Sequence, residues 1–283
     1  MPPPVMAMLA DGAYHYFSSF YSNLIVISDD GVLVTDTANV SRAQELKEEI
    51  AKLTDAPVTT IVLTHEHYDH VGGTGVFPDA SVVCHRNCEP IFNLHPSRQG
   101  EPNLIPELGD VPDKVDETFD TFKEIRVGEK VVQLHYLGPG DGDATTVVYL
   151  PDERIVVTSD MYEPRALSGA DVVDDKNFAG VRHILNTISK WPIDHAVNAH
   201  PLGTDPIDMM ENVEYYNDLF DAVKAKVDEA IAQAGGAAFG AYGLFDTLPG
   251  TLQLEKYQDW GNYDTAFPKH VERMLLALSL IHI

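Results

Sequence analysis

The sequence predicts an α/β fold in which helices and sheets form layers. Two stretches of alternating apolar and polar residues, one near the start and one in the middle of the chain, are typical of β-meanders. Short apolar strands and helical patterns follow each stretch, and strand–helix–strand runs of this kind pack as layers. With 283 residues the chain can bury a sizeable core.

The first half of the chain begins with the first meander, which we predict over residues 13–36. An amphipathic helix is expected over 41–53, with Ser41 as its candidate N-cap. Residues 58–63 are branched and apolar, which predicts a buried strand, and a second strand is expected at 81–83. These elements together predict a sheet that carries helices.

The second half begins with residues 93–120, which are rich in Pro, Asp and Glu and predict a long irregular excursion that folds over a site. The regular elements predicted after it are strands at 124–127, 131–137, 147–150, 155–158 and 196–198, and helices at 181–189 and 208–233. We expect all of residues 1–283 to form a single domain.

The charge of the chain restricts its partners. Its 19 Lys and Arg against 44 Asp and Glu give a net charge of −25, which argues against nucleic acid and is typical of a solvated surface. No apolar run approaches the roughly 18 to 20 residues of a membrane span. We therefore expect a soluble protein with a small-molecule substrate, cytoplasmic as the sequence stands, although a trimmed signal peptide is also compatible with it. Nothing in the sequence indicates an oligomeric state.

The last six residues, 278–283, allow two interpretations. They match the translation of a transposon-end adapter used in sequencing libraries, in which case they are not native. Alternatively, they are the apolar end of a helix that continues from residues 271–277.

A cluster of potential metal ligands directly follows the predicted strand at 58–63. It comprises His65, His67, Asp69 and His70. A His-x-His pair at a strand end can direct two imidazoles to one metal ion while the Asp and the last His turn to another, and these ligands suit zinc, iron or manganese. Burying so many titratable groups without partners would be costly. The cluster therefore predicts a metal centre.

The segment at 64–73, Thr-His-Glu-His-Tyr-Asp-His-Val-Gly-Gly, resembles the Thr-His-x-His-x-Asp-His-x-Gly-Gly signature of the metallo-β-lactamase superfamily. The resemblance implies a four-layer αββα sandwich and two divalent metal ions, with zinc ahead of manganese or iron. It also implies that Asp160 bridges the metals and that His200 is a ligand, since both follow apolar strands. By the same resemblance Asp36 orients the ligand loop.

The third His of the family pattern is missing from this chain. The family carries Gly-Pro-Gly-His-Thr-Asp where residues 138–143 read Gly-Pro-Gly-Asp-Gly-Asp. Either Asp141 replaces the imidazole beside His65 and His67, or Asp143 reaches in from a shortened loop, or the segment is a turn without a metal role. A carboxylate here would favour a harder ion such as manganese or iron.

These residues predict hydrolysis of an ester, lactone or amide bond by a metal-bound hydroxide, as in an esterase, a lactonase or a β-lactamase. Asp69 would pass the proton to the leaving group, and Tyr162 is a candidate oxyanion donor. The loops at 17–21, 93–120 and 163–178 suit a small, partly apolar, uncharged or cationic substrate.

Two other functions remain open. One is a single-iron oxidoreductase of the persulfide-dioxygenase kind, which uses two His and one Asp. The other is a binding scaffold without turnover, with or without metal.

Overall fold

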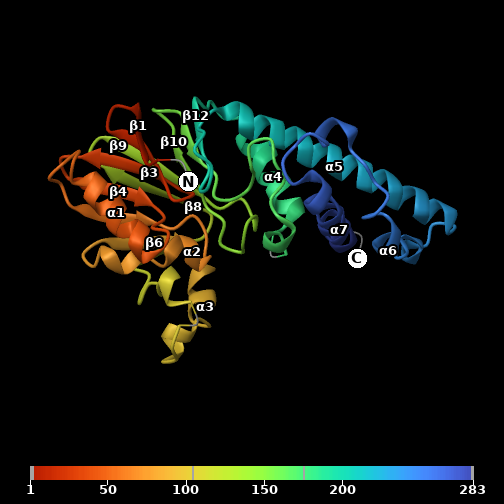
Figure 1. Cartoon of the computed structure of the whole chain (residues 1–283), viewed down its shortest axis with the longest axis horizontal. Coiled ribbons are helices and arrows are strands. Elements are labelled where there is room, and N and C mark those ends of the chain that lie inside the picture. The colour runs from red at the N-terminus through yellow and green to blue at the C-terminus, as the bar shows by residue number, and fades with distance from the viewer. Residues whose placement is uncertain (1–2, 104, 175, 282–283) are drawn as a thin grey trace. The chain divides into compact units, whose positions relative to one another are not determined.

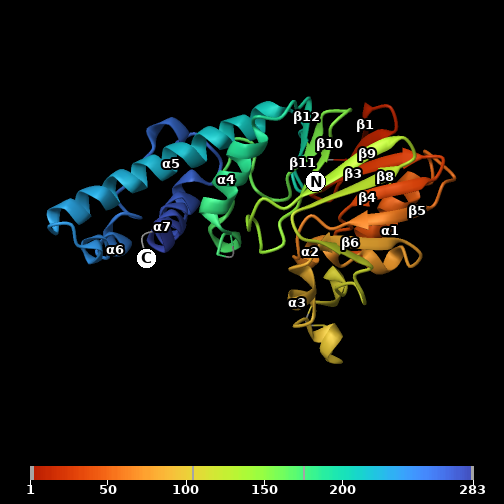
Figure 2. The ribbon, with the colours of Figure 1, turned by 180° about the vertical axis from the view of Figure 1, so that it is seen from behind.

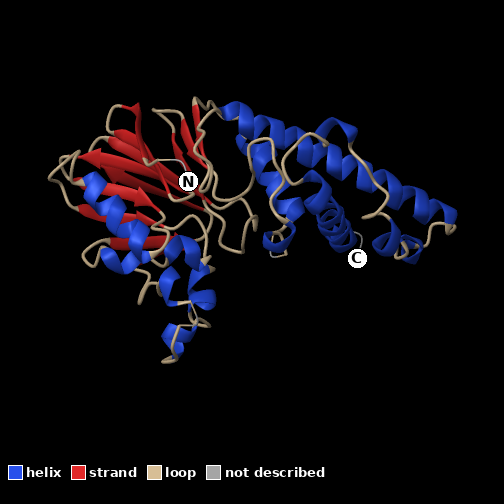
Figure 3. Cartoon of the chain, in the orientation of Figure 1, coloured by secondary structure: helices blue, strands red, loops and turns tan. Residues whose placement is uncertain are grey.

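The computed structural model of the chain describes residues 3–103, 105–174 and 176–281 (Figure 1). It contains two compact units, one formed by Met1–Met161 with Pro192–Pro206 and the other by Tyr162–Trp191 with Ile207–Ile283. All named strands lie in the first unit, whereas the described part of the second consists of helices and loops (Figure 3). That residues 1–283 form a single domain stays a prediction.

The first sheet of the first unit has seven strands, and each pairs with the next along the chain. They are β1 (Val5–Ala10), β2 (Ala13–Ser18), β3 (Tyr21–Ser28), β4 (Gly31–Thr35), β5 (Val58–Val62), β6 (Ser81–His85) and β7 (Glu117–Phe119). Pairing is antiparallel from β1 to β4 and parallel from β4 to β7. The predicted strands are present. Strands β1 and β7 were not predicted, because β7 lies within the Pro-, Asp- and Glu-rich excursion and the residues of β1 do not alternate between apolar and polar.

The second sheet has five strands in the order β12-β11-β10-β9-β8, which Figure 2 shows from behind. They are β8 (Phe122–Val127), β9 (Lys130–His135), β10 (Val147–Leu150), β11 (Ile155–Val157) and β12 (His195–Val197). Strands β11 and β12 are parallel and the other pairs are antiparallel. All five correspond to strands that the sequence predicts.

An apolar core joins the two sheets. Leu24, Leu33 and Val62 of the first sheet and Leu134 and Val157 of the second are buried in one cluster. Neighbouring side chains on a strand point to opposite faces of the sheet. The first sheet therefore needs a second cover on its other face.

Helix α1 (Val40–Ile50) provides that cover. Its Leu46 and Ile50 pack in one buried cluster with Ile25 and Ile61 of the first sheet. The first unit thus has a helix layer on one sheet and the second sheet behind it. The predicted mixed α/β fold with two sheets and helices is confirmed.

The N-cap of α1 differs from the prediction. The side chain of Asn39, not that of Ser41, accepts a hydrogen bond from the backbone N–H of Arg42 at 3.0 Å. Asn39 has the extended backbone of an N-cap, while Ser41 already lies in the first turn. The sequence offered two suitable cap residues two positions apart, and propensity alone does not separate them.

The predicted excursion packs against the loop that carries the candidate metal ligands. It follows α2 (Tyr68–Val71) and α3 (Cys88–Phe92) and contains the 3₁₀ turns Pro96–Gln99 and Pro106–Leu108. A Cβ on Gly72 would lie 1.7 Å from the carbonyl oxygen of Leu108, and one on Gly109 would lie 2.1 Å from that of Gly72. Only glycine permits this backbone contact.

The second unit is helical. Its helices are α4 (Phe178–Ile188), α5 (Pro206–Gln233), α6 (Leu244–Thr247) and α7 (Tyr263–Ile281), with 3₁₀ turns at Ala170–Val172, Ala238–Ala241 and Glu255–Tyr257. The helices predicted at 181–189 and 208–233 correspond to α4 and α5. Helix α7 continues through residues 278–281, and residues 282–283 lie outside the described ranges. Within those ranges no helix is long and apolar enough to cross a membrane.

A buried histidine links the segments of the second unit. Tyr215 Oη lies 2.9 Å from His270 Nδ1, and His270 Nε2 lies 3.0 Å from the carbonyl oxygen of Ser168. A neutral ring satisfies both contacts, because Nε2–H donates to Ser168 while Nδ1 accepts from Tyr215. Burial lowers the pKa of His270 to about 4.

This neutral histidine predicts a loss of stability in acid. The unfolded chain takes up a proton near pH 6.5 and the folded chain only near pH 4, so stability is complete above pH 6.5 and falls as the pH drops toward 4. We expect His270→Asn to be less stable than wild type at pH 7.5, yet to lose about 2 kcal/mol less between pH 7.5 and 4.5. Urea unfolding at both pH values measures this, and an unchanged pH dependence would contradict a neutral His270.

Candidate metal centre

The candidate ligands lie beyond the C-terminal ends of strands from both sheets, with Asp69 and His70 in the short helix α2 and the others in loops. His65 to His70 follow β5, Asp160 follows β11, and His200 follows β12. Asp141 lies in the loop between β9 and β10. The pairs β4–β5 and β11–β12 are parallel, so the strands of each pair end at one edge of their sheet. Side chains far apart in sequence are therefore brought together at this edge of the first unit.

The first group of ligands, called site one here, comprises His65, His67 and Asp141. Asp141 Oδ2 lies 3.6 Å from His65 Nε2 and 3.5 Å from His67 Nδ1. Two ligand atoms bound about 2.1 Å from one tetrahedral ion are separated by about 3.4 Å. Site one therefore has the spacing of a set of ligands around a single ion.

The alternative ligand Asp143 is not part of this group. It is exposed, and its backbone N–H donates to the carboxylate of Glu66 at 2.6 Å. Asp141, by contrast, is buried against the two histidines. Of the alternatives open at the sequence level, the geometry favours Asp141.

The second group, called site two here, comprises Asp69, His70 and His200. His70 Nε2 lies 3.4 Å from Asp69 Oδ2. His70 is buried, whereas the side chain of Asp69 is 36% exposed. Site two therefore includes a carboxylate that solvent or a substrate can reach.

Asp160 lies between the two sites. Its Oδ2 is 3.0 Å from His70 Nε2, 2.9 Å from His200 Nε2 and 3.8 Å from His65 Nε2. One oxygen atom thus faces histidines of both groups, which is the placement expected of a bridging carboxylate. That Asp160 bridges two metals stays a prediction.

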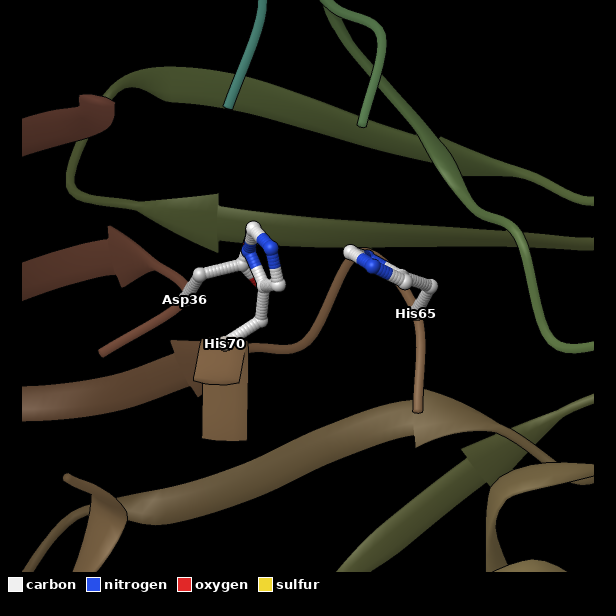
Figure 4. A group of neighbouring side chains, drawn as sticks. All are labelled: Asp36, His65 and His70. Carbon is white, nitrogen blue, oxygen red and sulfur yellow. The ribbon is translucent and has the colours of Figure 1, made fainter. Parts of the chain in front are cut away.

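Asp36 supports the start of the metal-binding run. Its Oδ1 accepts the backbone N–H of Thr64 at 2.8 Å, and its Oδ2 accepts the Thr64 hydroxyl at 2.7 Å. Figure 4 shows the Asp36 side chain directed toward His70, and the distance from Asp36 Oδ2 to His70 Nδ1 is 3.7 Å. This is the geometry expected of a residue that orients the ligand loop.

The second ring nitrogen of His65 also has neighbours. His65 Nδ1 lies 2.9 Å from Ser159 Oγ and 3.1 Å from Thr64 Oγ1. With Nδ1 held there, Nε2 faces the other ligands of site one. Ser159 was not among the predicted site residues, since a serine before a candidate ligand carries no pattern of its own.

His200 is held by the hairpin between β2 and β3. Its Nδ1 donates to the carbonyl oxygen of Phe20 at 2.8 Å, which leaves Nε2 to face Asp160. Ser19 and Phe20 have φ angles of 53° and 67°, in the left-handed region. The sequence does not reveal this turn, because neither residue is one that usually adopts such angles.

Tyr21 is a further neighbour of site two. The sequence predicts only that it belongs to a loop, 17–21, that lines the substrate pocket. Its Oη donates to Asp69 Oδ2 at 3.5 Å, and its ring lies 5.7 Å from that of His70 and 5.2 Å from that of His200. Burial raises the pKa of Tyr21, so the hydroxyl keeps its proton. Tyr21 can therefore orient the Asp69 carboxylate.

The residues fit metal ions. His65 Nε2 is fully buried and makes no hydrogen bond to any described residue, which is costly unless an ion or ligand satisfies it. Burial holds the pKa of His65 well below its usual value, so the ring is neutral and can ligate. Burial alone would raise the pKa of Asp160, but His70 and His200 hold it well below its usual value. The centre thus offers a neutral imidazole at His65 and an ionised carboxylate at Asp160. Burial alone would lower the pKa of His70 and His200, but Asp160 raises both, so a metal ion that binds these two rings displaces their protons.

Tyr162 is the first residue of the second unit, and it is buried. Its proposed role as an oxyanion donor stays a prediction.

The family model of the metallo-beta-lactamase superfamily matches residues 19–200 of the chain. These residues include every candidate ligand at the edge. The fold comparison agrees, since a metallo-beta-lactamase from Pontibacter korlensis has a TM-score of 0.61 at 17% identity over 76% of this chain and 99% of that one. The structure of TMB-1 has a TM-score of 0.60 at 17% identity over 77% and 99% of the two chains.

Three relatives of known name are similar in sequence. A linear primary-alkylsulfatase of Pseudomonas sp. is 23% identical over 67% of this chain and 42% of its own length. The alpha subunit of a 2,4-dinitroanisole O-demethylase of Nocardioides sp. is 26% identical over 50% and 40%. A type 2 metallo-beta-lactamase of Bacillus sp. is 24% identical over 48% and 48%. The chain thus spans less than half the length of these relatives.

The geometry of site one predicts the effect of losing its carboxylate. We expect Asp141→Ala to lose about one of two bound metal equivalents, because one of the three ligands of site one is removed. The matched control Asp143→Ala removes an exposed carboxylate of the same loop and keeps the backbone N–H that Glu66 accepts. Elemental analysis after dialysis measures both variants. Wild-type metal content in Asp141→Ala would mean that Asp141 is only a turn residue.

Proposed function

The chain belongs to the metallo-β-lactamase superfamily, and on that premise we propose that it is a metal-dependent hydrolase of an ester, lactone or amide bond. Members of the superfamily are metal-dependent hydrolases. The observation that carries the proposal is the position of Asp160 Oδ2, within 2.9 to 3.8 Å of histidines from two complete groups of ligands. A pair of sites that share one carboxylate suits two metal ions.

Two ions held there would supply a water of lowered pKa and would polarise the substrate oxygen. The residues of the chain have separate tasks around them. His65, His67 and Asp141 would hold one ion, and Asp69, His70 and His200 the other. Of these, the partly exposed Asp69 is best placed to carry a proton between water and the leaving group.

The completeness of site two favours a hydrolase over the alternative oxidoreductase. A single-iron enzyme needs two His and one Asp, which site one alone supplies. A single-iron mechanism does not require the second, adjacent group of Asp69, His70 and His200. A binding scaffold would keep the ligands, and only a search for turnover separates it from a hydrolase.

We propose zinc as the first candidate for both ions, with manganese or iron as alternatives. The carboxylate at position 141 favours the harder ions at site one, because it adds negative charge where the family has a neutral imidazole.

The substrate we propose is small, uncharged and partly apolar. A cavity of about 290 Å³ lies beside the metal-binding run and includes Tyr68, Ile91, Phe92, Leu94 and Val111 in its lining. None of the described residues that line it is Lys or Arg, and Glu66 is one of them, so the lining favours an uncharged group over an anionic one. The name of the linear primary-alkylsulfatase indicates an alkyl chain in the substrate of that relative, and such a chain would suit this lining.

The proposal is tested with protein that is stripped of metal and reloaded with zinc, manganese or iron. The substrates are nitrophenyl esters, lactones, an alkyl sulfate, a phosphotriester and a chromogenic cephalosporin. We expect turnover of at least one ester, lactone or amide and about two metal equivalents per chain. One equivalent of iron would instead favour the oxidoreductase, and inertness toward every substrate with every metal would contradict the hydrolase.

The apolar cavity gives a prediction on substrate size. Leu94 is 79% exposed at the cavity, so Leu94→Asp should fold normally. We expect kcat/KM for nitrophenyl octanoate to fall about tenfold and that for the acetate to change little, because only the longer chain reaches the altered wall. The control Ile105→Asp changes another exposed apolar residue of the excursion outside this lining. Equal losses for both esters would contradict an acyl-chain pocket.

A further inference from the structure

We propose that Glu66 is a positioning residue whose buried carboxylate shapes the loop at 140–144 and thereby holds Asp141 against His65 and His67. The inference rests on the metal centre of the proposed function. It assigns a task to the residue between the two histidines of the His-x-His pair, which the predicted chemistry leaves unused.

The carboxylate of Glu66 is occupied by the backbone of this loop. Glu66 is only 8% exposed. Its Oε1 accepts the N–H of Asp143 at 2.6 Å and its Oε2 accepts the N–H of Ala144 at 3.0 Å. Among the described residues no Lys or Arg forms an ion pair with it. Burial raises the pKa of Glu66, and backbone N–H groups, those of Glu66 itself, Asp143 and Ala144, oppose this effect.

The loop also requires close approach to this carboxylate. Gly142 has a φ of +97°, and a Cβ there would lie 2.7 to 2.8 Å from both oxygens and the carboxyl carbon of Glu66. The backbone therefore wraps closely over the carboxylate, in a left-handed conformation that favours glycine. Further bonds close the turn, with the N–H of Gly140 donating to the carbonyl of Gly142 and the Thr145 hydroxyl to the same oxygen.

The consequence for Asp141 follows from its short side chain. An Asp carboxylate has only two side-chain torsions, so its reach depends on where the backbone places its Cα. Asp141 immediately precedes Gly142, and its Oδ2 lies 3.5 to 3.6 Å from the nitrogens of His65 and His67. The tripeptide 65–67 thus supplies two ligands of site one and the anchor for the third.

A catalytic role for Glu66 is disfavoured by the same contacts. Both of its oxygens accept backbone N–H groups at hydrogen-bonding distance, and the side chain is buried. It would have to give up these bonds before it could accept a proton from a water or a substrate. Glu66 therefore acts through Asp141 and not on the reacting atoms.

The test compares metal affinity at the two sites by chelator competition with zinc and with manganese. Glu66→Gln keeps the size of the side chain but replaces one acceptor oxygen by an NH₂ group that faces a backbone N–H. In this titration, the metal-binding step that is lost in Asp141→Ala reports on site one. We expect Glu66→Gln to lower the metal affinity of site one about 10- to 100-fold and to change that of site two little. Glu66→Asp, which keeps both oxygens on a shorter arm, should lose less.

A second readout needs no metal. In the metal-free protein, Glu66→Gln should accelerate hydrogen exchange at the amides of Asp143 and Ala144, because their acceptor is impaired. Gly142→Ala disturbs the same contact from the side of the loop, because its Cβ would meet the Glu66 carboxylate, and it should likewise lower the metal affinity of site one. Asp116→Asn is the matched control, since Asp116 accepts the N–H of Val82 at 3.0 Å but belongs to neither site.

Wild-type affinity at site one together with unchanged exchange in Glu66→Gln would overturn the proposal. An equal loss at both sites would also overturn it, since it would show that Glu66 supports the fold in general. Neither measurement needs a substrate. Failure of the substrate panel would therefore contradict the hydrolase without deciding the role of Glu66.

Discussion

The pair of hydrogen bonds between Thr64 and Asp36 is the interaction on which the metal centre depends. It fixes the point where the chain leaves β5, and His65 is the next residue. The carboxylate oxygen that accepts the Thr64 hydroxyl, Oδ2, also faces His70 Nδ1 at 3.7 Å. Asp36 adopts a φ of 51°, a backbone conformation that costs on the order of 1 to 3 kcal/mol and persists only where surrounding contacts compensate it. Strain at this strand end is thus balanced by the bonds that orient the ligands.

Negative charge is the second constraint on the site. Asp36, Asp69, Asp141 and Asp160 all lie among the histidines at one edge of the sheets. Buried carboxylates need cations or donors, and bound metal ions satisfy several of them together. A carboxylate at position 141 also gives site one a harder set of ligands than three imidazoles would. Site two also consists of two imidazoles and one carboxylate, so the two groups offer the same kinds of ligand atom.

The ligands are held by contacts from several loops. Ser159 holds the second nitrogen of His65, the Phe20 carbonyl holds that of His200, and Tyr21 contacts Asp69. Such contacts fix the orientation of ligands and limit their motion. The edge itself is a property of the fold, whereas the apolar cavity beside Tyr68 is lined by residues of α3 and the excursion. Substrate choice is therefore expected to reside in these loops and not in the ligands.

The sequence by itself determined the fold class and the run from His65 to His70, because the periodicity of the strands and the spacing of the histidines are local patterns. Asp160 and His200 became candidate ligands through the resemblance to the metallo-β-lactamase pattern, in which each follows an apolar strand. Only the tertiary structure decided between Asp141 and Asp143, since that choice depends on which one a loop turns inward. The contacts of Ser159, Phe20 and Glu66 could not be predicted from the sequence for the same reason. Each joins segments that are distant in the chain, and pairing of that kind leaves no periodic trace in a single sequence.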